Sequence, residues 1–182
     1  MICSCIGFAL MTYFMTATPL QVVNVAQLGT SANATIIQWH VVAMFAPSFF
    51  TGSLIQRFGM IKILSAGVLA YIVAIVMALA GDTFTHYFTA LFLLGLGWNF
   101  LYIGGSTLVA RVATAEERGR VQGAADLATT SLVALASLTA GGLHSQFGWD
   151  VLVLSGCVPI GILACALVWF GFHQKSASLA AS

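Results

Sequence analysis

The stretch Gly52-Ser53-Leu54-Ile55-Gln56-Arg57-Phe58-Gly59 recurs 89 residues later as Gly141-Gly142-Leu143-His144-Ser145-Gln146-Phe147-Gly148. One copy follows the second apolar stretch of the chain and the other follows the fifth, so the repeating unit contains three apolar stretches. If each stretch crosses a membrane, an odd number of crossings inverts the second unit relative to the first. Arg57 of the first copy is replaced by Gln146 in the second, as the outer side of a membrane would favour.

The composition supports membrane crossings. Of the 182 residues, 60% are hydrophobic and 6% are charged, which is too little charge to cover a soluble domain. A helix of about 20 apolar residues crosses the hydrocarbon core, which is about 30 Å thick. The sequence therefore predicts an all-α membrane protein of six transmembrane helices, arranged as two inverted three-helix repeats. The spans are expected at 4–26, 36–56, 61–81, 84–110, 119–142 and 150–172.

These spans divide the chain into a first repeat at 1–83, a second at 84–172 and a tail at 173–182. The tail is small and polar, and it is expected to be disordered. Short polar joints separate the spans, at 29–33, 57–62, 81–85, 113–120 and 144–150. Pro19, Pro47 and Pro159 fall inside spans and are expected to kink their helices.

The basic residues indicate the orientation of the chain. All six lie in the even-numbered joints or in the tail, and the odd-numbered joints hold none. Because Lys and Arg gather on the cytoplasmic side of membrane proteins, both chain ends are expected in the cytoplasm. Basic residues dispersed in this way form no patch for nucleic acid. They are Arg57, Lys62, Arg111, Arg118, Arg120 and Lys175.

The cysteines predict neither a metal nor a cofactor. All four lie within apolar helices, where a thiol behaves as a small hydrophobe. Cys3 and Cys5 lack the spacing of a zinc site. The remaining two are Cys157 and Cys165.

Asp126 is the only acidic residue expected inside a span. An acid within a membrane is costly and usually faces a polar interior. One helical face carries a polar stripe with a single apolar break. Either the stripe is a cavity wall, with Asp126 as a proton or cation site, or Asp126 is a structural acid paired with a basic joint residue. Its members are Gln122, Asp126, Thr129, Thr130, Val133 and Ser137.

A second polar row lies on the span at 84–110, where Asn99, Tyr102 and Ser106 share one helical face. Such a row either binds substrate or forms hydrogen bonds between helices. His40, near the outer start of its span, either titrates and gates a path or sits at the membrane interface. The histidines at the joints, among them His144, are expected to be solvated.

Several of these stretches resemble transporters of the major facilitator superfamily. The joint at 52–62 is similar to the family's signature loop, with Gln56 where the family usually has Asp. The stretches 38–52, 94–102 and 116–126 look like the eighth helix, the tenth helix and the entry to the eleventh in bacterial members. The resemblance covers nearly all of this chain but only half of the family's usual twelve helices.

The resemblance implies the C-terminal six-helix half of a bacterial inner-membrane transporter, with a small-molecule substrate and proton coupling. A missing N-terminal six-helix half, or a second copy, would then supply the other wall of the path; otherwise the chain is a non-functional fragment. It also implies a charged latch on the cytoplasmic side that stabilises one access state. The alternative is that these charges serve only to set the topology, and both roles can hold at once. The latch residues are Gly52, Arg57, Gly59, Lys62, Glu117 and Arg118.

Two other classes of function compete with transport. Gly104-Gly105-Ser106 resembles the setting of an intramembrane serine nucleophile, which needs a histidine deep in the last span. The span at 150–172 has no histidine, so no enzyme is predicted. An accessory or channel-like membrane subunit stays open as the alternative, and the sequence does not indicate which small molecule is carried.

Overall fold

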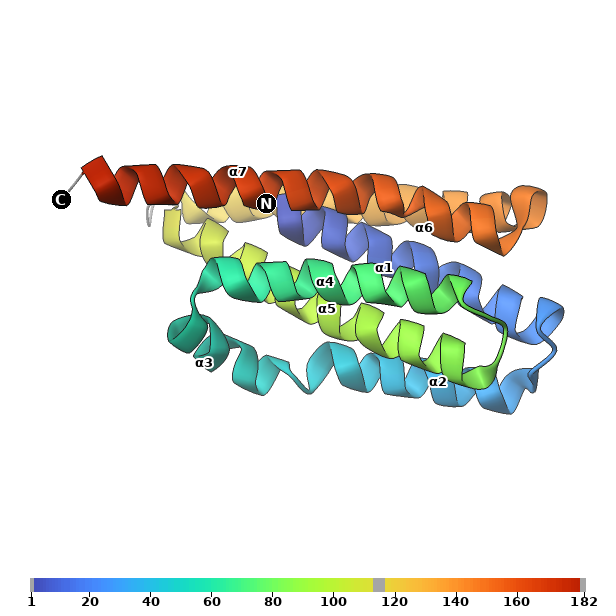
Figure 1. Cartoon of the computed structure of the whole chain (residues 1–182). Helices are drawn as coiled ribbons and strands as arrows, with labels where there is room; N and C mark the ends of the chain where they lie inside the picture. The colour runs from blue at the N-terminus through green and yellow to red at the C-terminus, as the bar shows by residue number, and fades with distance from the viewer. Residues whose placement is uncertain (1, 113–116, 181–182) are drawn as a thin grey trace.

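The structure, a computed structural model, describes the backbone of residues 2–112 and 117–180 and the side chains of residues 2–108, 117 and 119–171. Within these ranges the chain is helical and contains no strand. Figure 1 shows the helices lying alongside one another as an elongated bundle, which α7 extends at the C-terminal end. The elements are α1 (Ile2–Leu20), the π-helix η1 (Gln21–Val25), α2 (Gly29–Phe45), α3 (Ser48–Phe58), α4 (Met60–Leu79), α5 (Phe84–Val112), α6 (Arg118–Ser155) and α7 (Cys157–Ala180).

The helices are apolar enough to confirm the predicted all-α membrane protein. Four stretches of the described chain could cross a membrane, or five if α2 and α3 form one bent span. The fourth stretch runs for 53 residues, from Gly119 to Gly171. That is more than twice the length of about 20 residues that one crossing needs. Six crossings in an inverted repeat remain a prediction.

The two copies of the repeated sequence end in the same backbone conformation. Gly59, between α3 and α4, has φ 90° and ψ 152°. Gly148, inside α6, has φ 81° and ψ −177° and kinks that helix. Only glycine adopts this region without strain, because it has no Cβ. The repeat in sequence is therefore also a repeat in local structure, with Phe58 and Phe147 directly before the break.

Replacing Gly59 with alanine is expected to destabilise the protein by about 1–3 kcal/mol, since the side chain would force a sparsely allowed conformation. Gly52→Ala is the matched control, because Gly52 lies within α3 and a Cβ there meets no atom within 4 Å. Alanine favours a helix, so the control should keep or slightly raise stability. Thermal unfolding in detergent compares the two variants. Equal unfolding temperatures would contradict the claim that position 59 requires glycine.

The bend between α2 and α3 is stabilised by a side chain from α5. Pro47 has no N–H, and its ring clashes with the carbonyl of residue i−4, so the helix breaks and turns by 45°. Asn99 Nδ2 donates to the Met44 carbonyl at 2.7 Å and to Ser48 Oγ at 2.6 Å. Thr51 Oγ1 donates to Asn99 Oδ1 at 2.5 Å. A break inside a membrane helix is tolerated where a neighbouring helix binds the freed polar groups in this way.

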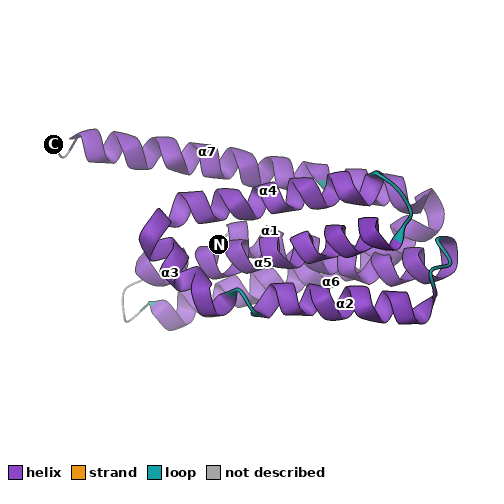
Figure 2. Cartoon of the chain, turned by 60° about the horizontal axis from the view of Figure 1, so that its bottom comes forward, coloured by secondary structure: helices purple, strands orange, loops and turns teal. Residues whose placement is uncertain are grey.

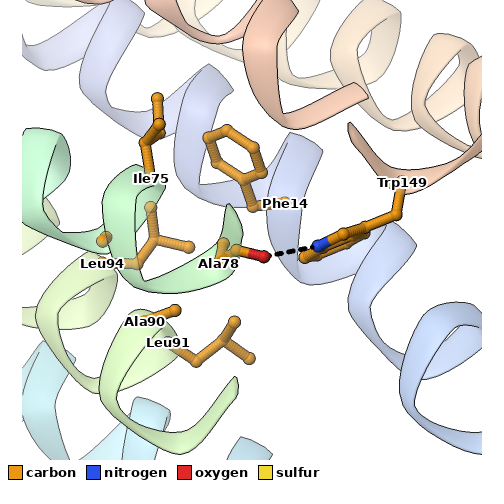
Figure 3. A pocket seen from close by; sticks show the side chains of 8 residues that line it. Phe14, Ile75, Ala78, Ala90, Leu91, Leu94 and Trp149 are labelled. Atoms are coloured by element: carbon orange, nitrogen blue, oxygen red, sulfur yellow. Dashed lines mark hydrogen bonds between the residues drawn. The ribbon is translucent and has the colours of Figure 1, made fainter. Parts of the chain in front are cut away.

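The core lies around α1 and α5, since α1 packs on both α5 and α6, and α4 packs on α5 (Figure 2). The α4–α5 contact is close at Gly67 and Gly97, where a Cβ on Gly97 would lie 2.5 Å from Tyr71. Figure 3 shows an apolar gap between α1, α4, α5 and α6, beside which Trp149 Nε1 donates to the Ala78 carbonyl at 2.9 Å. The gap holds about 10 Å³, which is too small for a substrate, so it belongs to the packing.

Two sequence expectations about the ends of helices were wrong. The joint expected at 29–33 is helical, because α2 begins at Gly29. The tail expected to be disordered continues α7 as far as Ala180. Polar residues by themselves do not stop a helix, and neither stretch contains the proline that would end one.

Candidate functional site

His40 lies in the contact between α2 and α5. Its side chain is completely buried, and Nδ1 donates to the Leu91 carbonyl at 2.7 Å. Gly95 faces it so closely that a Cβ there would lie 2.6 Å from the His40 carbonyl oxygen. His40 Nε2 is buried without a hydrogen-bond partner among the described residues. The His40 side chain thus packs inside the bundle, and both a place at the membrane interface and a role in gating stay predictions.

The row of Asn99, Tyr102 and Ser106 does not act as one surface. Asn99 is fully buried, and both ends of its amide are occupied at the α2–α3 bend. Ser106 Oγ donates to the Ile103 carbonyl of its own helix at 3.1 Å. Tyr102 and Ser106 are both partly exposed. For Asn99, the structure favours hydrogen bonding between helices over direct contact with substrate.

Tyr102 belongs to a group of four rings that sequence reasoning missed. This aromatic cluster consists of Phe8 of α1, Phe45 of α2, and Trp98 and Tyr102 of α5. The Trp98 and Tyr102 rings are stacked, with centroids 5.0 Å apart and planes 8° apart. Phe8 meets both of them edge-on, at 5.4 and 5.5 Å, and Phe45 meets Trp98 edge-on at 5.8 Å. The only signal in the sequence is the four-residue spacing of Trp98 and Tyr102 on one helical face.

The polar stripe on α6 is divided by the contact with α1. Thr129 is buried there, and its Oγ1 lies 3.1 Å from Cys5 Sγ. Gln122 and Asp126 are exposed, and Gln122 Nε2 donates to Asp126 Oδ1 at 2.9 Å. Asp126 forms no ion pair with any side chain that the structure describes. Its carboxylate is therefore open to whatever faces this surface of the bundle.

The predicted latch lies around Gly59. Arg57 and Lys62 are exposed on either side of this glycine, and the Arg57 guanidinium carbon lies 5.4 Å from the centroid of the Phe58 ring. Glu117 is also exposed, whereas the side chain of Arg118 lies outside the described residues. The latch stays a prediction.

A hydrogen-bonded chain links η1, α5, α6 and the loop between α4 and α5 at one end of the bundle, and sequence reasoning missed it. Tyr87 Oη donates to Asp82 Oδ1 at 2.5 Å and accepts from Gln21 Nε2 at 3.1 Å. His144 Nε2 donates to Gln21 Oε1 at 3.0 Å, so this histidine is partly buried and bonded to protein. Gln21 begins the π-helix η1, and such a local change of helix often occurs at functional positions.

An open groove of about 450 Å³ runs between α1, α6 and α7. Its lining is mostly apolar and includes Ile6, Leu132 and Ile162. Neither Asp126 nor any member of the aromatic cluster lines it. The groove and the polar and aromatic residues described above are therefore separate features of the surface.

Comparison with known proteins identifies the family. The family profile named Major Facilitator Superfamily matches residues 1–181. The chain is 45% identical over 146 residues to the riboflavin transporter RfnT of Brucella anthropi. This match covers 80% of this chain and 36% of that protein. No solved structure matches significantly.

Two proteins of Bacillus subtilis are also similar. The uncharacterized MFS-type transporter YdeG is 32% identical over 167 residues, covering 87% of this chain and 37% of that protein. The uncharacterized MFS-type transporter YddS is 29% identical over 163 residues, covering 88% of this chain and 37% of that protein. The chain thus spans little more than a third of the length of these relatives. It belongs to the major facilitator superfamily.

Proposed function

We propose that this chain forms one wall of the path along which a proton-coupled transporter moves a small molecule across the membrane. The observation that carries the proposal is the broken helix α2–α3, whose bend Asn99 stabilises beside the aromatic cluster. Discontinuous helices near the middle of the membrane are typical of substrate sites in secondary transporters. The family membership supports the same function.

Riboflavin is the first candidate substrate. The support is the 45% identity to a relative named as a riboflavin transporter. That identity covers 36% of the relative, so the substrate of the whole protein is part of the proposal.

The proposed architecture is six crossings in two inverted three-helix repeats, with both chain ends in the cytoplasm of a bacterial cell. The complete separation of Lys and Arg between the joints supports it, as does the shared conformation of Gly59 and Gly148. A second six-helix unit, from an N-terminal half or another copy, supplies the opposite wall. The latch around Arg57 and Lys62 is proposed to stabilise one of the two access states.

Uptake of radiolabelled riboflavin tests the function. The cells used cannot make the vitamin, and they express the protein in the form that its natural host produces. We expect uptake above that of cells carrying an empty vector, and loss of accumulation when a protonophore collapses the proton gradient. Accumulation that survives the protonophore would contradict proton coupling. If neither riboflavin nor any solute of a broad panel enters, the transport function itself is wrong.

The 182-residue chain by itself is expected not to transport as a monomer. One wall leaves exposed polar groups such as Asp126 without an opposing bundle, and such groups are costly in lipid. Purified chain in liposomes should show no substrate-dependent flux unless it dimerises. Robust flux by a proven monomer would contradict the need for a second unit.

A further inference from the structure

The aromatic cluster lies near the middle of α5 and at the bend between α2 and α3. Trp98 is about 21 Å from the start of α5, which is 29 residues and about 43 Å long. Phe45 is the last residue of α2, at the bend of the broken span. If α5 crosses the membrane, the cluster lies near the middle of that crossing, where secondary transporters bind their substrates.

Trp98 has an unsatisfied hydrogen-bond donor. Its side chain is 5% exposed, and Nε1 is buried with no partner among the described residues. A buried donor without an acceptor is destabilising, and native proteins rarely keep one. The structure therefore raises the question of what accepts this hydrogen bond.

Other buried aromatic residues of this protein do have partners. Trp149 is 7% exposed, and its Nε1 donates to the Ala78 carbonyl at 2.9 Å. Tyr71 is 1% exposed, and its hydroxyl donates to the Gly7 carbonyl at 2.7 Å. Trp98 departs from this pattern although its neighbour Asn99 is fully bonded. The other two buried side-chain atoms without a partner among the described residues, His40 Nε2 and Asn33 Oδ1, can act as acceptors, so Trp98 Nε1 is the one unpaired buried donor there.

The cluster is also accessible from one side. Phe45 is 56% exposed, so its ring can turn aside without disturbing the core. Tyr102 is partly exposed, and no hydrogen bond joins its hydroxyl to the described part of the chain. A ligand that enters beside Phe45 meets aromatic faces and edges together with two free polar groups. A flat ring system with acceptor atoms on its edge matches this chemistry.

We infer that the aromatic cluster binds the flat heteroaromatic ring of the transported molecule, and that a carbonyl oxygen or ring nitrogen of that ring accepts a hydrogen bond from Trp98 Nε1. This inference rests on the proposed transport function and specifies its substrate class. Recognition then depends on the ring and not on a polyol chain attached to it. Riboflavin combines a flat ring and a polyol chain in one molecule. Compounds that carry only one of these parts can therefore distinguish recognition of the ring from recognition of the chain.

Competition against riboflavin uptake is the first test. Lumichrome carries a flat tricyclic ring without the ribityl chain, whereas ribitol is the chain without the ring. We expect lumichrome to compete with riboflavin and ribitol not to compete. Competition by ribitol but not by lumichrome would overturn the inference and leave transport intact.

Substitution of the cluster is the second test. Trp98→Phe keeps a ring and removes the N–H, and Tyr102→Leu removes a ring from the cluster. Each is expected to raise the KM for riboflavin about tenfold, the size expected for losing a stacking or hydrogen-bonding contact. Trp169→Phe, the same change at a residue of α7 outside the cluster that is 62% exposed, is the matched control and should leave KM unchanged.

Phe45→Leu keeps the test decisive if a change at Trp98 prevents folding, because Phe45 is exposed and its replacement leaves the core intact. It too should raise the KM for riboflavin. If all variants that fold keep the KM of the unmodified protein, the cluster is packing and the inference is wrong. If the protein carries only solutes without an aromatic ring, the inference fails while the transport function stands. If it carries nothing, both fail.

Discussion

Asp126→Asn is expected to reduce proton-driven accumulation of substrate to background, while exchange of substrate down its gradient survives. Asparagine keeps the size of the side chain and its hydrogen bonding with Gln122, but it cannot bind and release a proton. Asp126 is exposed on α6 and forms no ion pair with a described side chain, so no basic neighbour fixes its charge. An acid in such a position usually serves an ion pathway.

The measurement compares accumulation with exchange across a range of pH values. Asp150→Asn is the matched control, since it makes the same change at an exposed acid close to the break at Gly148. The control should keep both activities. Unchanged accumulation and pH dependence in Asp126→Asn would show that this acid is structural, and the coupling site would then lie elsewhere.

Asn99→Leu is expected to destabilise the protein by about 2–4 kcal/mol. The substitution removes three hydrogen bonds at the α2–α3 bend and leaves the Met44 carbonyl without its side-chain donor. Losing one partner of a buried pair costs about 1–3 kcal/mol, although interhelical hydrogen bonds in membranes average nearer 0.6 kcal/mol. The bend should also become more flexible, because the break at Pro47 remains while the hydrogen bonds from Asn99 that hold it are lost.

Thermal unfolding and the yield of folded protein in detergent measure this effect. Ser106→Ala is the control on the same helix, because among the described residues Ser106 Oγ donates only to the carbonyl of Ile103, three residues earlier. It should change stability by less than about 0.5 kcal/mol. If Asn99→Leu is as stable as Ser106→Ala, the bend does not depend on Asn99.

The sequence predicts the fold class well because the membrane imposes it. Long apolar stretches must form helices in lipid, where every backbone polar group has to be bonded within the chain. The kink at Pro47 was also predictable, since proline removes a donor from the helix. The extent of the helices was not, because a polar joint such as 29–33 can extend a helix into solvent as easily as end it.

The site was less predictable because tertiary contacts decide it. The burial of His40 and Asn99 depends on Leu91 and Met44, which belong to other helices. The aromatic cluster unites residues from three helices, so helical spacing reveals only the pair within α5. Asp126 was identified from sequence alone because a single acid in an apolar stretch is rare whatever its neighbours are.

In the proposed architecture, the chain consists of two inverted three-helix repeats of a transporter. Labelling of single cysteines with a membrane-impermeant maleimide tests it at equivalent positions of the repeat. Gln56 and Ser145 correspond to each other, and both are exposed. Each is changed to cysteine in a background where the four native cysteines are replaced, namely Cys3, Cys5, Cys157 and Cys165.

In intact cells, Ser145→Cys is expected to be labelled from outside, whereas Gln56→Cys is expected to react only after the membrane is permeabilised. This result follows because three crossings separate the two joints and place them on opposite sides. Labelling of both positions from the same side would require an even number of crossings between them, and it would contradict the inverted repeat.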